Sequence, residues 1–306
     1  MANRISTRSI YDNLLHTTIG AQDKLNRLQH SIADGTRLRS PSDDPVGTHL
    51  ALRARERLSA NEQYTKSLEH SLTHLEASDA VLTQIEDLVT EVRALQTAAA
   101  NDTLGGEERA AMAAQVDQLT RQLVELGNQQ FAGVYLFGGK QTQTAPFALE
   151  EGRDGAVARV TRSGDLRAIE SPVVRQVDRD VLLSIHAKAS DVFGEGQELF
   201  GTLIELREAL AKNSGDAIRQ SGAQIDQAQN GVLAAHGVVG TLMQRAETLK
   251  TQLERDSMSH EAERARLEDL DVAEAMFEMS QQQTALQAAL EAGSRILTLS
   301  LLDYMK

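Results

Sequence analysis

Two histidines four residues apart are the first side chains in the sequence that could bind a metal ion. His70 and His74 share one face of a helix at this spacing, and such a pair supplies half of a typical zinc site. No third ligand stands at a useful spacing, and Glu69 does not complete an HExxH motif. We therefore expect no metal site here, but two solvated histidines on a long helix.

A glycine-rich stretch at residues 133–140 (GVYLFGGK) is superficially similar to a phosphate-binding loop. In the Walker pattern, four residues separate the two glycines, the second glycine stands directly before the lysine, and a Ser or Thr follows the lysine. An extra glycine intervenes here, and Gln141 follows Lys140. The stretch therefore predicts a turn that enters a sheet, and no nucleotide site.

Paired carboxylates occur at Asp43 and Asp44 and again at Asp178 and Asp180, and each pair has a simpler role as a helix cap or a turn. The sequence contains no GxSxG motif, no Ser–Lys motif and no EF-hand loop. We predict a protein that is not an enzyme and has no cofactor, no metal and no small-molecule substrate.

The composition favours thin helical assemblies. Of the 306 residues, 41% are hydrophobic but only 3% are aromatic, as in helix pairs filled by Leu, Ile, Val, Ala and Met. A formal net charge of −13 opposes non-specific binding to nucleic acid or to an anionic membrane. The absence of cysteine excludes disulfides and thiolate metal sites.

Export of this chain would need a route other than a Sec signal peptide. Residues 1–20 carry Arg4 and Arg8 but no apolar core run. Nowhere in the chain is there an apolar run long enough to span a membrane.

Helical periodicity predicts a seam helix at each end of the chain. A weak heptad seam follows the N-terminal helix to Ile32, and a second seam follows residues 272–301. Neither helix should be stable alone, so each depends on a partner for packing. We expect their seam residues to form an assembly interface: Leu14, Leu25, Leu28, Ile32, Met276, Met279, Leu286, Leu290, Leu297 and Leu301. Further apolar residues are then available for neighbouring subunits: Leu15, Ile19, Leu38, Leu270, Leu299 and Leu302.

A join follows the N-terminal helix. Gly35 stands where a helix C-terminus favours a left-handed residue, so the helix should end near Asp34. Asp44 followed by Pro45 predicts an N-cap and the first helical residue of the next helix. Asp43 adds negative charge at the positive end of that helix dipole.

Four further helices and a β-rich middle complete the predicted order. Helices are expected from Pro45 to about Ala100, from Glu107 to about Leu126, and from Asp216 to about Arg255, with a short one before the last of these. Between residues 131 and 195 the periodicity is lost, and short strands of one small sheet are expected, including one at residues 166–177.

The predicted fold class is mainly α with a β insertion. The arrangement is an elongated antiparallel helical hairpin or coiled-coil bundle, with paired N- and C-terminal helices and a small β-rich tip domain. We assign residues 1–44 and 262–306 to the terminal pair, residues 45–140 and 190–261 to the rod, and residues 141–189 to the tip.

Residues 4–47 (RISTRSIYDNLLHTTIGAQDKLNRLQHSIADGTRLRSPSDDPVG) strongly resemble the N-terminal region of the bacterial flagellin family. Residues 128–147 (NQQFAGVYLFGGKQTQTAPF), the turn at 162–165 (RSGD) and residues 269–305 resemble the members that join hook to filament. Filament flagellins have a pattern closer to N-x-F-N-G at residues 128–133, where this chain has Ala132, and they end in Leu-Leu-Arg.

The resemblance implies a structural subunit that is exported unfolded through the flagellar type III apparatus to the extracellular flagellum. It also implies a ring of copies of this chain, contacts with hook-associated protein 1 and flagellin, and an export chaperone. We further expect residues 1–40 and 265–306 to become ordered only on assembly. The alternatives are a filament flagellin and a cytoplasmic helical-hairpin signalling module, which the Gly-rich β insertion opposes.

Overall fold

The computed structural model describes residues 2–101 and 104–304, and the chain divides into two compact units. Unit 1 comprises residues 1–60 and 256–306, and unit 2 comprises residues 61–255. Two long helices, α2 (Pro45–Ala99) and α7 (Gly215–Glu268), contribute residues to both units. The predicted fold class, mainly α with a β insertion, is confirmed.

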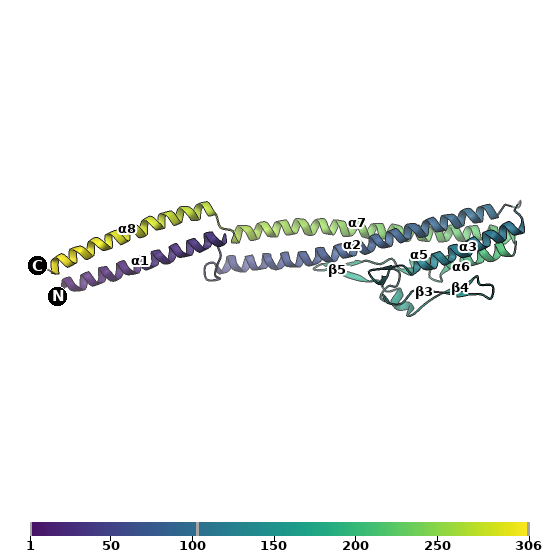
Figure 1. The fold of residues 1–306 in the computed structure, drawn as a ribbon, viewed down its shortest axis with the longest axis horizontal. Coiled ribbons are helices and arrows are strands. Elements are labelled where there is room, and N and C mark those ends of the chain that lie inside the picture. The colour runs from purple at the N-terminus through teal and green to yellow at the C-terminus, as the bar shows by residue number, and fades with distance from the viewer. Residues whose placement is uncertain (1, 102–103, 305–306) are drawn as a thin grey trace. The chain divides into compact units, whose positions relative to one another are not determined.

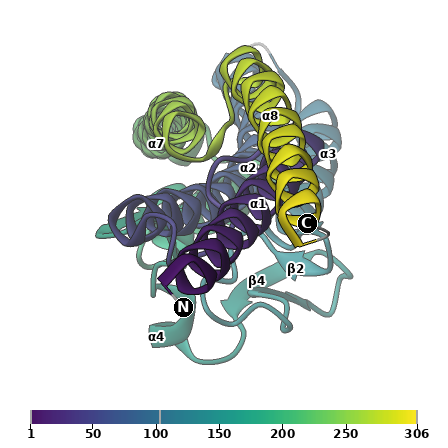
Figure 2. The ribbon, with the colours of Figure 1, turned by 90° about the vertical axis from the view of Figure 1, so that its left-hand side faces the viewer.

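Unit 1 is built on an antiparallel pair of terminal helices, α1 (Ala2–Asp34) and α8 (Val272–Tyr304). The two helices lie side by side with the N- and C-terminal ends at the same end of the pair (Figure 1). Figure 2 shows the same pair from those ends. The first residues of α2 and the last residues of α7 complete the unit.

Unit 2 is a helical bundle in which α2 and α7 are joined by α3 (Gly106–Gly127) and α6 (Glu198–Ala211). Glu108 closes the start of α3, because its Oε2 accepts the backbone N–H of Gly105 at 2.7 Å. The predicted seam of α7 faces the core, with Ile225, Val232 and Val239 at most 1% exposed. Four phenylalanine rings pack together within the same core: Phe137, Phe147, Phe193 and Phe200.

The β insertion is not the single small sheet that the sequence predicts. It forms three separate antiparallel hairpins that lie along the helices of unit 2. Strands this short satisfy few backbone groups in each other, and they gain most of their stability by packing on neighbouring helices. The hairpins are β1 (Gln130–Phe131) with β2 (Val134–Tyr135), β3 (Phe147–Glu151) with β4 (Val157–Arg162), and β5 (Val174–Asp178) with β6 (Val181–Ser184).

One predicted strand is partly helical. Leu166–Ile169 forms the single turn α4, because Asp165 caps it: its Oδ1 accepts the N–H of Arg167 at 2.9 Å and its carbonyl accepts that of Ile169 at 3.0 Å. The strand expected there begins only at Val174. A second short helix, α5 (Ala189–Phe193), precedes α6.

The glycine-rich residues 133–140 form β2 and a turn, as predicted. Gly133 and Gly139 have φ of 79° and 56°, values that suit glycine in tight turns, and no helix follows them directly. Within residues 2–101 and 104–304, no helix combines the length and the apolar character needed to cross a membrane.

Candidate assembly interface

The terminal helices meet through a narrow seam. On α1 the contact face carries Leu25, 7% exposed, and the half-buried Leu14, Leu28 and Ile32, all four predicted as seam residues. Among the described apolar side chains of α1 and α8, only Leu25 and Ala275 are buried. The pair therefore has a thin core and gains little free energy from apolar burial within one chain.

The contact face of α8 is made largely of small residues. Ala275, Ala289 and Gly293 recur on it with the half-buried Met279 and Leu286. A Cβ at Gly293 would lie 2.5 Å from Leu14 Cδ2, so this glycine lets the two helices approach closely.

Two predicted seam residues of α8 lie outside that contact face. Met276 and Leu290 are 53% and 56% exposed, each one residue past an alanine that faces α1. Leu297 and Leu301 belong to α8, but their side chains lie outside the described residues, as do those of Leu299 and Leu302.

Four of the six large apolar side chains that are exposed on the described parts of α1 and α8 lie on one side of the pair, and Val272 and Phe277 lie outside this group. In an antiparallel pair, positions one residue past the seam on each helix face the same flank, which places Leu15 of α1 on the side of Met276 and Leu290. Leu15 is 47% exposed, and Ile19 extends the same flank at 51%. The outer face is defined here as Leu15, Ile19, Met276 and Leu290, with Phe277, 69% exposed, beside it.

The join after α1 has the conformation that its residues predict. The helix ends at Asp34, and Gly35 follows with φ of 68°. Asp44 caps α2, since its Oδ1 accepts the N–H of Gly47 at 2.8 Å. The Asp43 carboxylate accepts the N–H of Ser40 at 2.9 Å, and α2 begins at Pro45.

This join is bonded to the short link between α7 and α8. The N–H of Arg37 donates to the carbonyl of Glu268 at 2.7 Å, and the N–H of Leu270 donates to that of Gly35 at 3.1 Å. Thr36 and Asp269 form an antiparallel bridge between these bonds. The break after α1 and the break between α7 and α8 are more than 200 residues apart in the sequence, and these bonds make them one structural element.

A buried carboxylate holds this element, and sequence reasoning did not single it out. The Glu268 side chain is 7% exposed, and its Oε2 accepts bonds from Arg55 at 2.8 Å and from Arg264 at 3.1 Å. Because Arg55 lies on α2 and Glu268 ends α7, the bonds connect the two helices next to the join. Helical spacing predicts only the pair with Arg264, four residues away.

We expect Glu268→Gln to loosen the join. The amide keeps the shape and an acceptor oxygen but removes the buried negative charge that pairs with Arg55 and Arg264, which costs about 1–3 kcal/mol. Hydrogen exchange should show faster exchange at the amides of Arg37 and Leu270, with residues 61–255 unchanged. Glu261→Gln is the matched control, because Glu261 pairs with the same Arg264 on the surface. Equal exchange in both variants would assign no special role to Glu268.

The histidines predicted as solvated differ from each other. His70 is exposed, as expected, but His74 is only 6% exposed and contacts the ring of His186 at a centroid distance of 5.1 Å. The prediction for His74 was wrong, because its partner lies 112 residues further along the chain. Within the described parts of the chain, no cluster of three or more His, Asp or Glu side chains could hold a metal ion.

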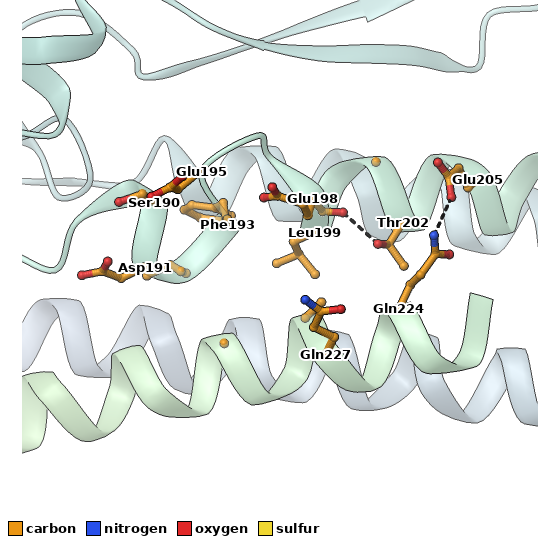
Figure 3. Close-up of a pocket in the computed structure, with 15 residues that line it drawn as sticks. Ser190, Asp191, Phe193, Glu195, Glu198, Leu199, Thr202, Glu205, Gln224 and Gln227 are labelled. Carbon is orange, nitrogen blue, oxygen red and sulfur yellow. Dashed lines mark hydrogen bonds between the residues drawn. The ribbon is translucent and has the colours of Figure 1, made fainter. Parts of the chain in front are cut away.

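An open groove of about 520 Å³ lies among α5, α6 and α7 of unit 2 (Figure 3). Its acidic side chains are Asp191, Glu195, Glu198 and Glu205. Two of them are engaged locally: Glu205 accepts the Gln224 amide at 3.2 Å, and Glu198 accepts the N–H of Gly196 at 3.0 Å. We assign no chemistry to this groove.

Family comparisons match both helical ends of the chain. The model of the bacterial flagellin N-terminal helical region matches residues 5–142, and that of the C-terminal helical region matches residues 223–305. Together they cover more than two thirds of the sequence. The chain belongs to the bacterial flagellin family. As a member of this family it is a structural protein of the flagellum, and its helices α1 and α8 lie within the two matched regions.

Two curated relatives align with nearly all of this flagellin-family chain. Flagellar hook-associated protein 3 of Escherichia coli is 25% identical over 318 residues, which cover 99% of this chain and 100% of the relative. The protein of the same name from Salmonella typhimurium is 24% identical over 94% of each chain. A flagellin of Listeria monocytogenes is 19% identical over 87% of this chain and 86% of its own.

Solved structures share the fold. A structure described as a flagellar hook-associated protein from Vibrio parahaemolyticus has a TM-score of 0.65 at 20% identity, and covers 74% of this chain and 100% of its own. The flagellar junction protein FlgL from Legionella pneumophila has a TM-score of 0.56 at 14% identity, with 72% and 100% covered.

Proposed function

We propose that this flagellin-family chain is the subunit that joins the hook of the bacterial flagellum to its filament. The observation that carries the proposal is the end-to-end alignment with relatives named hook-associated protein 3, at 25% and 24% identity. The Listeria flagellin aligns over less of the chain and at lower identity. Ala132 in place of the flagellin Asn supports the same choice.

The subunit assembles as a ring of copies of itself between hook-associated protein 1 and the first flagellin subunits. It leaves the cell unfolded through the flagellar type III apparatus, after release from an export chaperone. The thin seam of α1 and α8, with Leu25 and Ala275 as its buried apolar residues among those described, supports a pair that is completed by neighbouring subunits.

The domain assignment follows from this role. Residues 1–44 and 262–306 form the assembly domain, residues 45–140 and 190–261 the rod, and residues 141–189 the outer β-rich part. Gly35, Asp43, Asp44 and Pro45 place the join between the first two parts and do no chemistry.

Deletion of the encoding gene tests the junction role. Cells that lack the subunit should make hooks without attached filaments and should release flagellin into the medium, because flagellin synthesis and export do not need the junction. Restoring the gene should restore the filaments. If the mutant instead releases no flagellin into the medium and carries only short filaments or no filaments, the chain is a filament flagellin, which is the second candidate.

A further inference from the structure

Two histidines from distant parts of unit 2 share a buried site that contains no residue of α1 or α8. His74 lies on α2, and His186 follows β6; each is 6% exposed, and their ring centroids are 5.1 Å apart. Phe131 of β1 packs edge-on against His74 at 6.1 Å. The site therefore joins two hairpins of the β insertion to the long helix.

The hydrogen bonds of the site suit two neutral rings. The N–H of Gly139 donates to His186 Nε2 at 3.2 Å, so this nitrogen carries a lone pair and the ring proton lies on Nδ1. His74 bonds to the backbone of Ile185, and Nδ1 of both rings is buried without a partner. A proton added to His186 would face the N–H of Gly139, donor against donor, and one added to His74 Nδ1 would find no acceptor.

The surrounding charges also oppose protonation. The two rings face each other, and the positive charge of Arg175 on β5 lowers the pKa of His74. No carboxylate in the described part of the chain bonds to either ring. Burial, followed by the neighbouring His74, lowers the pKa of His186 from 6.5 to about 4. Burial is also the main cause that lowers the pKa of His74, although the bond to Ile185 acts against it.

A third histidine in the same unit has the opposite surroundings. His236 of α7 lies between two carboxylates of α2, with Nδ1 2.6 Å from Glu86 Oε1 and Nε2 2.8 Å from Asp79 Oδ1. Both ring nitrogens can donate only when the ring is protonated. Burial alone would lower the pKa of His236, but the bonds to Glu86 and Asp79 outweigh it and raise this pKa above its ordinary value.

We propose that the contact of His74 with His186 is an acid-sensitive attachment, which lets the segments around residues 130–140 and 181–187 detach from α2 in mild acid while α2 and α7 stay paired. The His74 and His186 contact contributes its stability above pH 6.5, and that stability is lost as the pH falls towards about 4. The His236 contact contributes below pH 6.5, and its stability is lost as the pH rises through the raised pKa. Acid therefore weakens the first contact and preserves the second.

Hydrogen exchange on the full-length chain tests this attachment. Protection factors, which remove the intrinsic pH dependence of exchange, are compared at about pH 7.5 and about pH 5. With the pKa of His186 at about 4 in the folded chain and 6.5 in the open one, peptides covering residues 134–140 and 181–187 should lose protection roughly 30-fold. Peptides covering residues 79–86 and 230–240 should keep or gain protection. Equal protection of the strand peptides at both pH values overturns the proposal.

The double variant His74→Gln with His186→Gln should abolish this loss, because glutamine keeps a polar group near each Nε2 and does not titrate. His70→Gln, an exposed change one turn from His74, should behave as the unmodified chain. A loss that persists in the double variant, or disappears in His70→Gln, contradicts the proposal. Ring ¹⁵N shifts of the unmodified chain give an independent test: of its 8 histidines, His186 should still be neutral at about pH 5 in the closed state, where an ordinary histidine is protonated. Titration of all of them near pH 6.5 overturns the attachment even if the variant does not fold.

Discussion

Cells that carry Leu286→Asp in this chain should make hooks but few or no attached filaments. Leu286 is half-buried on the face of α8 that packs on α1. Replacing it removes apolar contact and places a carboxylate in the seam, a loss of about 2 kcal/mol or more. Because the seam has so few buried side chains, a loss of this size should prevent α1 and α8 from pairing. Electron microscopy of the cells, with flagellin measured in the medium, gives the result.

The same experiment needs a partner variant and a control. Leu28→Asp places the same charge on the α1 side of the seam and should have the same effect. Ala288→Asp adds a carboxylate two residues from Leu286, at an exposed position away from both the seam and the outer face, and should leave filaments attached. Residues 61–255 should show unchanged hydrogen exchange in all three purified variants. Normal filaments on Leu286→Asp cells would contradict a role for the α1 and α8 pair in assembly.

The end of α1 and the start of α2 were predictable because they depend on neighbouring residues, whereas α7, expected to end at about Arg255, continues to Glu268. Gly35 ends α1 and Asp44 with Pro45 begins α2, since a left-handed residue and an N-cap act within a few positions of where they stand. The buried seam of α7 was equally readable, because unbroken heptads repeat the same signal. Local rules also explain why α4 is helical where the sequence predicts a strand, since Asp165 ends the preceding turn and also caps α4.

Contacts between distant segments were not predictable in the same way. His74 is a polar residue on a long helix, so the helical pattern predicts a solvated side chain. The burial of His74 depends on His186 and Gly139 of the β insertion, which the pattern does not include. The bond between Arg55 and Glu268 likewise joins helices that are far apart in sequence. One sequence carries no signal for such pairs.

The contact face of α8 is a further feature that the sequence did not predict. A seam read from the sequence favours large apolar residues, and it therefore includes Met276 and Leu290. In the structure the small residues Ala275, Ala289 and Gly293 face α1, and Gly293 leaves the space that Leu14 occupies. The large side chains are left on the flank. Within a single chain this is an unfavourable exposure of apolar surface, and it becomes favourable when another subunit covers it.

Leu290→Asp should therefore separate assembly from folding. Leu290 is 56% exposed on the outer face, so the charge should not alter the contact of α1 with α8 within the chain. In a ring the same carboxylate would be buried against a neighbouring subunit, at a cost of several kcal/mol. We expect hydrogen exchange of residues 12–34 and 272–294 to match the unmodified chain, while cells carrying the variant lose attached filaments.

Ala288→Asp is again the matched control, because it adds the same charge on the opposite flank of α8. If Leu290→Asp cells keep normal filaments while Leu286→Asp cells lose them, neighbouring subunits do not use the outer face, and the assembly contacts must lie elsewhere on the pair. If Ala288→Asp is as harmful as Leu290→Asp, both flanks are covered in the ring. Loss with Leu290→Asp alone would assign the contact to the flank of Leu15, Ile19 and Met276, where the apolar side chains gather.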